Sequence, residues 1–467
     1  MAASLQQKLA KLLGSDAVSD DSATLAAHAT DKWFASREPE VVVFATSTAQ
    51  VSKLMKFAHR NGIPVTPRGA GYGYVGGCVP LRGGIALSLA RMTRIKEISA
   101  PDSIAVVEPG VITGVLQAEV RKRGLYYPPD PASLKDCSIG GNIATNAGGP
   151  RCLKYGVTRS YVLGLEVVLA NGDVLRTGGR THKNKTGFDL VGMFTGSEGL
   201  LGVITEATLR LLPLPPARAS IAASFRTFRQ AAKTVQEIFC AGFLPAALEI
   251  ADPFTLRCAR EYLVREIAPG AKSLLLIDLD GHPESVRGET ASMVRLLKKV
   301  SALQVTTAFG EEECEKLWGM RRAYSTSLKS SGLAKLNEDI VVPRGRLVEL
   351  VEFCERLAKK YGHPVACFGH AGDGNIHVNI MAANYHTDRA VHARVQKALD
   401  ELFAQVLAWG GVITGEHGIG IAKQRWWPQA TSPVSRAVHV ALKTALDPKG
   451  ILNPGKFVQP GRLSSKK

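Results

Sequence analysis

The chain has 467 residues, a hydrophobic fraction of 45%, a charged fraction of 21% and a formal net charge of +17. This length predicts two or three domains rather than one core, and no apolar run approaches the roughly 18–20 residues that cross a bilayer. The basic residues are spread along the chain rather than grouped with aromatic side chains, which argues against a nucleic-acid-binding protein.

The N-terminal residues 1–21 alternate apolar and charged side chains, as a surface helix does. They lack the apolar stretch and the small-residue cleavage site of a secretory signal. We therefore expect a cytoplasmic protein. A basic surface also attracts anionic lipids, so peripheral association with the inner face of the membrane is a further candidate.

The first half of the chain alternates short apolar strands with helices. A helix is expected over residues 48–61, where apolar residues recur with helical spacing, with Thr48 as its N-cap and Asn61-Gly62 as its stop. An Asn-Gly turn at 171–172 predicts a hairpin. Strands are expected at 41–44, 63–66, 85–89, 104–108, 162–169 and 174–175.

Four residues with three prolines, 213–216, mark a boundary, because proline this dense continues neither a central strand nor a helix. Strands alternating with long amphipathic helices follow and predict a second α+β domain. The strands are expected at 274–279, 366–368 and 377–381, and the helices at 228–239, 285–300, 346–361 and 388–409.

A loop with five glycines in ten residues, 68–77, follows one of the predicted strands. Glycine allows left-handed backbone angles, and consecutive N–H groups can then surround a pyrophosphate. The helix that opens after the glycines in a Rossmann motif is absent. Further segments rich in glycine and polar residues follow at 128–131, 138–149 and 194–206.

Two histidines, His370 and His377, flank a Gly-Asp-Gly turn, and Glu416 and His417 are adjacent. Two imidazoles and one carboxylate make a three-ligand set that leaves a metal position open for substrate. His417 could then act as a base. His377 and Asn379 lie two apart on a predicted strand and so face the same way. On these residues alone a metal hydrolase is an alternative, but it gives the glycine segments no role.

Together these segments resemble the FAD-linked oxidases of the vanillyl-alcohol oxidase (PCMH) type over nearly the full chain. Within that family the resemblance is to the branch that holds the D subunit of glycolate oxidase, D-lactate dehydrogenase and D-2-hydroxyglutarate dehydrogenase. It implies an α+β fold with a PCMH-type FAD-binding domain of two α+β subdomains at 1–215. A ferredoxin-like substrate domain with the metal site at 216–420 and a C-terminal segment at 421–467 that returns to the flavin would follow.

The resemblance implies that FAD is bound noncovalently in an extended form. Two departures, Tyr72 and Leu200, replace small hydroxyl residues that are common in such segments, and neither removes a required glycine. The implied cofactor-binding residues are Pro67, Arg68, Gly69, Ala70, Gly71, Tyr72, Gly73, Gly76, Gly77, Pro129, Asp130, Ser133, Ser138, Gly140, Gly141, Asn142, Thr145, Asn146, Gly148, Gly196, Glu198, Gly202, Val203, Ile204 and Asn453.

The resemblance also implies the chemistry. His370, His377 and Glu416 would hold a divalent metal, with Zn²⁺ the first choice and Mn²⁺ or Fe²⁺ as alternatives. His417 would be the catalytic base, and Asn379 would bind substrate by a hydrogen bond. Arg321, with Arg322 as the alternative, would hold the substrate carboxylate and take part in catalysis.

The implied activity is oxidation of a small D-2-hydroxy acid to the 2-oxo acid, with hydride passed to the flavin N5. Asn337 stands where the D-2-hydroxyglutarate branch has a lysine, which favours glycolate or D-lactate. The chain has no iron–sulfur cysteine pattern. Electrons would therefore pass to oxygen, a quinone or a partner, and the resemblance implies an iron–sulfur subunit or an electron-transferring flavoprotein as that partner. The alternatives are an electron-transfer subunit of a larger complex and a D-2-hydroxyglutarate dehydrogenase; a homodimer is a candidate assembly.

Overall fold

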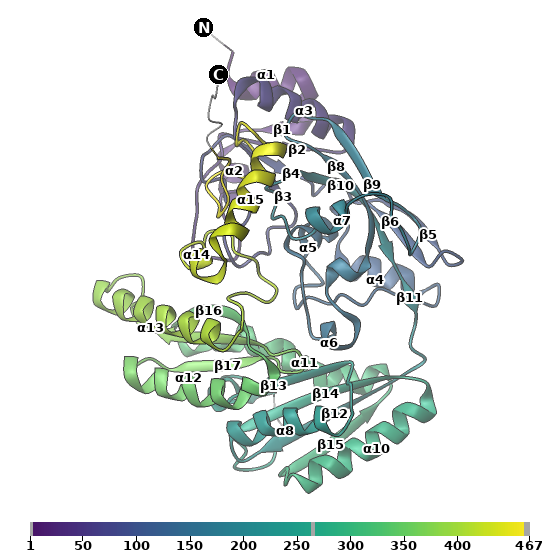
Figure 1. The fold of residues 1–467 in the computed structure, drawn as a ribbon, viewed down its shortest axis with the longest axis vertical. Coiled ribbons are helices and arrows are strands. Elements are labelled where there is room, and N and C mark those ends of the chain that lie inside the picture. The colour runs from purple at the N-terminus through teal and green to yellow at the C-terminus, as the bar shows by residue number, and fades with distance from the viewer. Residues whose placement is uncertain (1–2, 263–266, 462–467) are drawn as a thin grey trace. The chain divides into compact units, whose positions relative to one another are not determined.

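The computed structural model describes residues 3–262 and 267–461, which form two compact units (Figure 1). The first unit takes in Met1–Gly148, Val157–Leu214 and Glu416–Lys467, and the second takes in Gly149–Gly156 and Pro215–Gly415. Each unit combines helices with largely antiparallel sheets, so the predicted α+β class is confirmed. The three predicted domain ranges stay predictions.

The first unit contains two main sheets. In one, β2, β4 and β3 are parallel and β1 is antiparallel to β2; the other is antiparallel, in the order β5-β6-β10-β8-β9. A short pair joins β7 and β11. The strands are β1 (Val18–Ser19), β2 (Val41–Phe44), β3 (Val65–Arg68), β4 (Ile85–Ser88), β5 (Ile95–Ser99), β6 (Ile104–Val107), β7 (Leu125–Tyr126), β8 (Val162–Val168), β9 (Val174–Gly178), β10 (Val203–Arg210) and β11 (Leu212–Pro213).

The helices of the first unit cover these sheets. The best predicted one, α3, spans the predicted range, and Gly62 ends it in the left-handed conformation. Its N-cap is Ser47 rather than the predicted Thr48, because the Ser47 side chain accepts the Gln50 amide. The helices are α1 (Leu5–Leu13), α2 (Ser22–Ala27), α3 (Thr48–Asn61), α4 (Thr113–Arg121), α5 (Ile139–Thr145), α7 (Leu190–Phe194), α14 (Trp427–Ala430) and α15 (Pro433–Leu446).

The second unit is built on one seven-stranded antiparallel sheet in the order β15-β12-β14-β13-β17-β18-β16. Its strands are β12 (Ala217–Phe225), β13 (Ala247–Ala251), β14 (Ser273–Gly281), β15 (Gln304–Phe309), β16 (Ala334–Val341), β17 (Val365–His370) and β18 (Asn375–Ala382). Its helices are α6 (Cys152–Tyr155), α8 (Phe228–Cys240), α9 (Pro253–Cys258), α10 (Pro283–Lys299), α11 (Glu311–Ser327), α12 (Leu347–Tyr361) and α13 (Arg389–Ala408).

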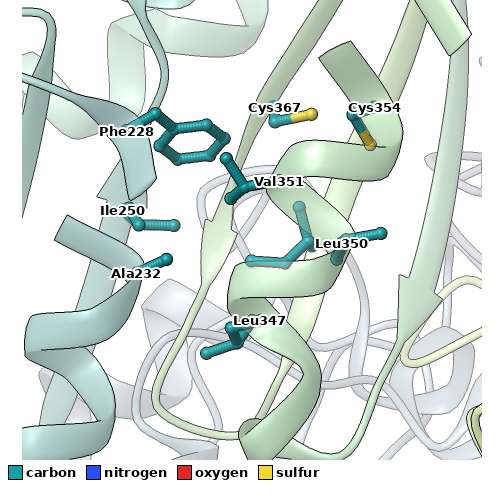
Figure 2. Close-up of a pocket in the computed structure, with 9 residues that line it drawn as sticks. Phe228, Ala232, Ile250, Leu347, Leu350, Val351, Cys354 and Cys367 are labelled. Carbon is teal, nitrogen blue, oxygen red and sulfur yellow. The ribbon is translucent and has the colours of Figure 1, made fainter. Parts of the chain in front are cut away.

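Helices cover both faces of this sheet. On one face α8 and α12 lie side by side over Ile250, Cys367 and Ile376, and an apolar pocket remains between them (Figure 2). Strand residues alternate between faces, so Phe368 and His377 belong to the opposite face. There Phe368 packs with Trp318 and Tyr324 of α11. The polar residues described below lie on this α11 face.

The structure confirms most predicted elements and corrects some. Residues 1–2 of the helix expected over 1–21 lie outside the described residues. The rest of that range is α-helical only over α1 (Leu5–Leu13), because Gly14 ends the helix and a 3-10 turn and a strand follow. The strand predicted at 63–66 is observed two residues later, as β3. The hairpin predicted around the Asn-Gly turn is formed by β8 and β9. Within residues 3–262 and 267–461, no helix is both long enough and apolar enough to span a membrane.

Candidate active site

The glycine loop begins where β3 ends. Gly71 and Gly76 have φ of +73° and +71°, a region that residues with a side chain rarely adopt. A Cβ at Gly71 would also collide with the Arg68 guanidinium. That guanidinium donates to the Thr30 carbonyl at 2.7 Å and to Cys78 Sγ at 3.1 Å. Arg68 therefore braces the loop against its neighbours.

The glycine loop is in contact with the predicted cofactor segment at 138–149. A Cβ at Gly69 would lie 2.5 Å from the Ser138 Oγ. Ser138 is the N-cap of α5, and its side chain accepts the Gly141 amide. The glycine loop and the start of α5 therefore pack together with no room for a side chain between them.

The segment at 194–206 and the C-terminal tail also contact these two segments. The Gly196 amide donates to the Ile143 carbonyl at 2.8 Å. Asn453, with φ of +44°, donates its side-chain Nδ2 to the carbonyls of Gly77 at 2.9 Å and Glu198 at 2.8 Å. Four segments that are far apart in the sequence thus meet within the first unit.

Several residues predicted to bind the cofactor have side chains that contact other parts of the protein. Asn142 donates to Thr113 Oγ1 at 2.7 Å, Asn146 accepts the Arg159 amide at 2.8 Å, and Val203 packs in the core. The other predicted residues lie in the same segments: Pro67, Ala70, Tyr72 and Gly73 at the loop, Pro129, Asp130 and Ser133 between β7 and α5, Gly140, Thr145 and Gly148 in or just after α5, and Gly202 and Ile204 at β10.

His417 also belongs to the first unit. Its ring stacks on Tyr74 of the glycine loop, with ring centroids 5.2 Å apart and planes inclined by 27°. Its Nε2 lies 3.8 Å from the carboxylate of the neighbouring Glu416. The imidazole predicted to be the base is therefore placed against the predicted flavin loop.

The two histidines of the second unit lie on the hairpin of β17 and β18. His370 and His377 are 4% and 7% exposed, and their ring centroids are 5.6 Å apart. The backbone turn between them brings them to one face of the sheet, as the Gly-Asp-Gly motif predicted. His370 Nδ1 lies 2.6 Å from Glu249 Oε1 on β13.

Glu249 connects His370 to Arg321. Its second oxygen forms an ion pair with Arg321 Nε of α11. Burial alone would raise the pKa of the Glu249 carboxyl, but the charges and hydrogen bonds of Arg321 and His370 outweigh it and lower this pKa to about 2. A carboxylate that accepts the Nδ1 proton of a histidine leaves Nε2 available to a metal.

The third predicted ligand, Glu416, directly follows Gly415, the last residue of the second unit. The Gly415 amide and the Thr414 hydroxyl donate to Asp339 at 3.0 and 2.7 Å. Asp339 is paired with His377 across β16 and β18. One ligand atom from each of His370, His377 and Glu416 lies within 4.8 Å of the others. Two imidazoles and a carboxylate at this spacing suit a borderline divalent metal.

The predicted substrate residues lie on the same sheet face. Arg321 is buried beside the rings of Tyr324 and Phe368. Its Nη edge has no hydrogen-bond partner within residues 3–262 and 267–461. Asn379 is fully buried and donates Nδ2 to the carbonyls of Ala366 and His377. Its Oδ1 accepts no hydrogen bond within the same residues.

Asn337 stands where the D-2-hydroxyglutarate branch has a lysine, and the sequence predicted only part of what surrounds it. Asn337 is paired with Asn379 across the strands, and its buried Oδ1 accepts no hydrogen bond in the described part of the chain. Lys335, two residues earlier on the same strand, donates to Ser325 Oγ at 2.6 Å. Burial lowers the pKa of the Lys335 ammonium to about 8.

Sequence reasoning missed Glu249 and the anchoring role of Asp339. The one signal for Glu249 was a single carboxylate inside the otherwise apolar run 246–251. A buried charge in a strand requires a partner. The partners, Arg321 and His370, are 72 and 121 residues away in the sequence.

Two family models match the chain. The FAD binding domain matches residues 39–178, and the model of FAD linked oxidases, C-terminal domain, matches residues 214–457. The chain belongs to the FAD-linked oxidase family. It is an oxidoreductase that binds FAD, as the resemblance implied.

Curated relatives of this oxidase cover most of its length. It is 40% identical over 419 residues to glycolate oxidase subunit GlcD of Bacillus subtilis, spanning 90% of this chain and 89% of that protein. It is 34% identical to D-lactate dehydrogenase of Anaerostipes hadrus, again over 90% of this chain and 89% of that protein.

Solved structures share the fold of this oxidase. The p-cresol methylhydroxylase structure aligns with a TM-score of 0.80 at 21% identity, over 97% of this chain and 96% of that one. The 4-ethylphenol oxidase of Gulosibacter chungangensis aligns with a TM-score of 0.77 at 23% identity, over 97% of each chain. The fold thus agrees with the vanillyl-alcohol oxidase type named from the sequence.

The residues present fit an extended dinucleotide cofactor. At Gly69, Gly71 and Gly76 of the loop, and at Gly140 in α5, a Cβ would lie within 3 Å of a neighbouring atom, so the groups available to a pyrophosphate are backbone atoms. Asn453 has a buried Oδ1 that accepts no hydrogen bond within the described residues, beside Gly77 and Glu198. Such a group suits a donor on a bound ligand.

Proposed function

We propose that this oxidase is an FAD- and metal-dependent dehydrogenase of a small D-2-hydroxy acid, D-lactate or glycolate. The observation that carries the proposal is the grouping of His370, His377 and Glu416, with His417 next to Glu416 in the chain. The relatives named D-lactate dehydrogenase and glycolate oxidase subunit support the substrate class. A hydrolase is disfavoured because the FAD-binding domain would then have no role.

In this proposal each residue has one task. Arg321 holds the substrate carboxylate through its Nη edge, since Nε is engaged by Glu249. His417 removes the hydroxyl proton. Asn379 offers Oδ1 to the substrate. FAD, when bound, supplies the hydride acceptor for the C2 hydrogen. A divalent metal held by His370, His377 and Glu416, Zn²⁺ as first choice, would supply a Lewis acid that lowers the hydroxyl pKa.

Glu249 connects the proposed carboxylate clamp to the proposed metal site. One buried carboxylate fixes both the proposed carboxylate clamp, Arg321, and a proposed metal ligand, His370. A substrate whose carboxylate meets Arg321 would therefore have its neighbouring hydroxyl close to the metal position, as a 2-hydroxy acid does. The pair argues for an acid with adjacent carboxylate and hydroxyl rather than for a simple alcohol.

The electrons would leave through an acceptor outside the chain. We propose a quinone, an iron–sulfur subunit or an electron-transferring flavoprotein, because two relatives are named as subunits of glycolate oxidase. Activity with an artificial dye and none with oxygen would favour such an acceptor. Equal turnover with oxygen alone would argue against it.

The variant His417→Ala tests the proposed base. We expect the purified variant to keep FAD but to lose anaerobic flavin reduction by D-lactate or glycolate, measured as bleaching in a stopped-flow instrument. General-base removal lowers rates by roughly 10²–10⁴-fold. His439→Ala, at an exposed position of α15, is the matched control. Flavin reduction at the wild-type rate in His417→Ala would rule out the role.

The double variant His370→Ala/His377→Ala tests the metal site. We expect elemental analysis to find no stoichiometric divalent metal in the variant and close to one equivalent in the wild type, with FAD content equal in both. The exposed His392 of α13 provides the control, His392→Ala. Full metal occupancy in the double variant would refute the ligand set.

A further inference from the structure

Glu198 occupies an unusual position between α7 and β10. It is 8% exposed and has φ of +50°, in the left-handed region that residues other than glycine seldom adopt. Both oxygens of its carboxylate are used: Oε1 accepts the Ile419 amide and Oε2 accepts the Gly420 amide, each at 2.8 Å. A strained, buried carboxylate with two charge-assisted hydrogen bonds indicates a specific task.

The segment that Glu198 holds directly follows His417. Residues 418–420 belong to no helix or strand. Gly418 and Gly420 have φ of +88° and +48°, and a Cβ at Gly418 would lie 2.7 Å from the Glu198 Oε1. The backbone that follows His417 therefore packs directly against this carboxylate.

The backbone of Glu198 is fixed by two other segments. Its amide donates to the Ala144 carbonyl at the end of α5, at 2.8 Å. Its carbonyl accepts Nδ2 of Asn453 at 2.8 Å. One residue thus connects α5 and the C-terminal tail to the loop of His417, all within the first unit.

Burial raises the pKa of the Glu198 carboxyl above its ordinary value. The Ile419 and Gly420 amides and the lysines Lys456 and Lys423 offset only part of that rise. A carboxylate offers no donor to the phosphates of FAD, which are themselves acceptors. Its two amide contacts explain its presence in the segment better than a direct bond to the cofactor.

We propose that Glu198 is a positioning residue for His417. By holding the Ile419 and Gly420 amides, it keeps the imidazole stacked on Tyr74 beside the flavin loop. The proposal rests on the proposed function, in which His417 is the base.

The test compares Glu198→Gln with wild type, at full FAD occupancy. Glutamine keeps the size of the side chain but turns one acceptor into a donor that faces an amide N–H. We expect FAD content to be unchanged and hydrogen exchange at Ile419 and Gly420 to rise about tenfold. We expect the limiting rate of anaerobic flavin reduction to fall about tenfold with little change in substrate Kd.

A matched control is Glu206→Gln on β10, where Glu206 forms an ion pair with Lys96 on β5, two strands away in the same sheet. We expect it to behave as wild type in all three measurements. Glu198→Ala should show a larger rise in exchange and a larger fall in the reduction rate than Glu198→Gln. If the alanine variant does not fold, the glutamine variant decides alone.

The outcomes separate the two hypotheses. Wild-type exchange at residues 418–420 in Glu198→Gln, or loss of FAD without a change in that exchange, would overturn the positioning role. Normal flavin reduction in His417→Ala would instead overturn the proposed function. The exchange measurement in Glu198→Gln would still show whether Glu198 orders residues 418–420.

Discussion

The glycine loop of the first unit and the histidine pair of the second unit are built in opposite ways. At Gly69 and Gly71 the loop has no space for even a Cβ, so the exposed groups are backbone atoms. At His370 and His377 the strands are regular and the working groups are side chains, held by Glu249 and by the register of β17 and β18. The first site depends on the absence of side chains at its glycines. The second site depends on the side chains that its strands carry.

This difference predicts different sensitivities. The backbone site should fail when a single methyl group is added, with little regard to its chemistry. The side-chain site should tolerate changes of size but fail when a hydrogen-bonding or ionic partner of the ligands is changed. The following variants test that contrast.

Glu249→Gln is expected to have the largest effect. Glutamine keeps the shape but removes the charge shared by Arg321 and His370, which leaves a buried guanidinium without its counter-ion. We expect metal affinity to fall by roughly 10–100-fold and the substrate KM to rise, while FAD content stays constant. Metal titration of the apoprotein measures the first effect.

The control for this variant is Glu315→Gln. Glu315 lies on α11, as Arg321 does, and pairs with Arg218 and Arg322, each at 2.8 Å. Equal metal affinity in Glu249→Gln and Glu315→Gln would show that Glu249 does not support the metal site.

Gly71→Ala should weaken FAD binding by about tenfold. The left-handed conformation alone is unfavourable for alanine by about 1–2 kcal/mol, and 1.4 kcal/mol is a factor of ten in affinity. The control is Gly179→Ala, outside the predicted cofactor segments of the same unit, because a Cβ there would meet no atom within 4 Å and no positive φ is required. FAD titration of both apoproteins decides; equal affinities would mean that the loop does not hold the cofactor.

Lys335→Met should stabilise the protein by about 1 kcal/mol at pH 7. The lowering of the Lys335 pKa from 10.5 to about 8 corresponds to roughly 3 kcal/mol of unfavourable charge burial, offset partly by loss of the bond to Ser325. Because the folded-state pKa is the lower one, wild-type stability should rise between pH 8 and pH 10.5. The variant should lack this rise.

Lys443→Met provides the contrast in the first unit. Lys443 is fully buried but donates to Asp447 and to the carbonyls of Leu200 and Leu452. Its removal leaves a buried carboxylate without a cation, so we expect destabilisation. Urea titrations of both variants measure the effect; the same sign for both would contradict the account.

The sequence predicted what local chemistry determines. The bounds of α3 follow from its apolar spacing and from Gly62, and the hairpin of β8 and β9 follows from Asn171-Gly172. The histidine pair was recognisable because both imidazoles flank one short turn. The glycine loop was recognisable because few other arrangements require so many glycines.

What the sequence did not predict depends on distant partners. The strand β12 (Ala217–Phe225) consists largely of small and polar residues, which have a weak preference for strands. It nevertheless pairs with β14 on one side and with β15 on the other. Glu249 and Glu198 carry roles that appear only when α11 and the 418–420 loop are in place. Such roles are set by tertiary contacts rather than by a motif.

We propose that this FAD-linked oxidase takes hydride from a D-2-hydroxy acid. The most direct measurement is anaerobic titration of the FAD- and Zn²⁺-loaded protein with D-lactate, glycolate, D-2-hydroxyglutarate and L-lactate, followed by flavin absorbance. We predict full bleaching by D-lactate or glycolate and none by L-lactate. Absence of bleaching by every D-acid and by glycolate, or preferential bleaching by L-lactate, would contradict the account.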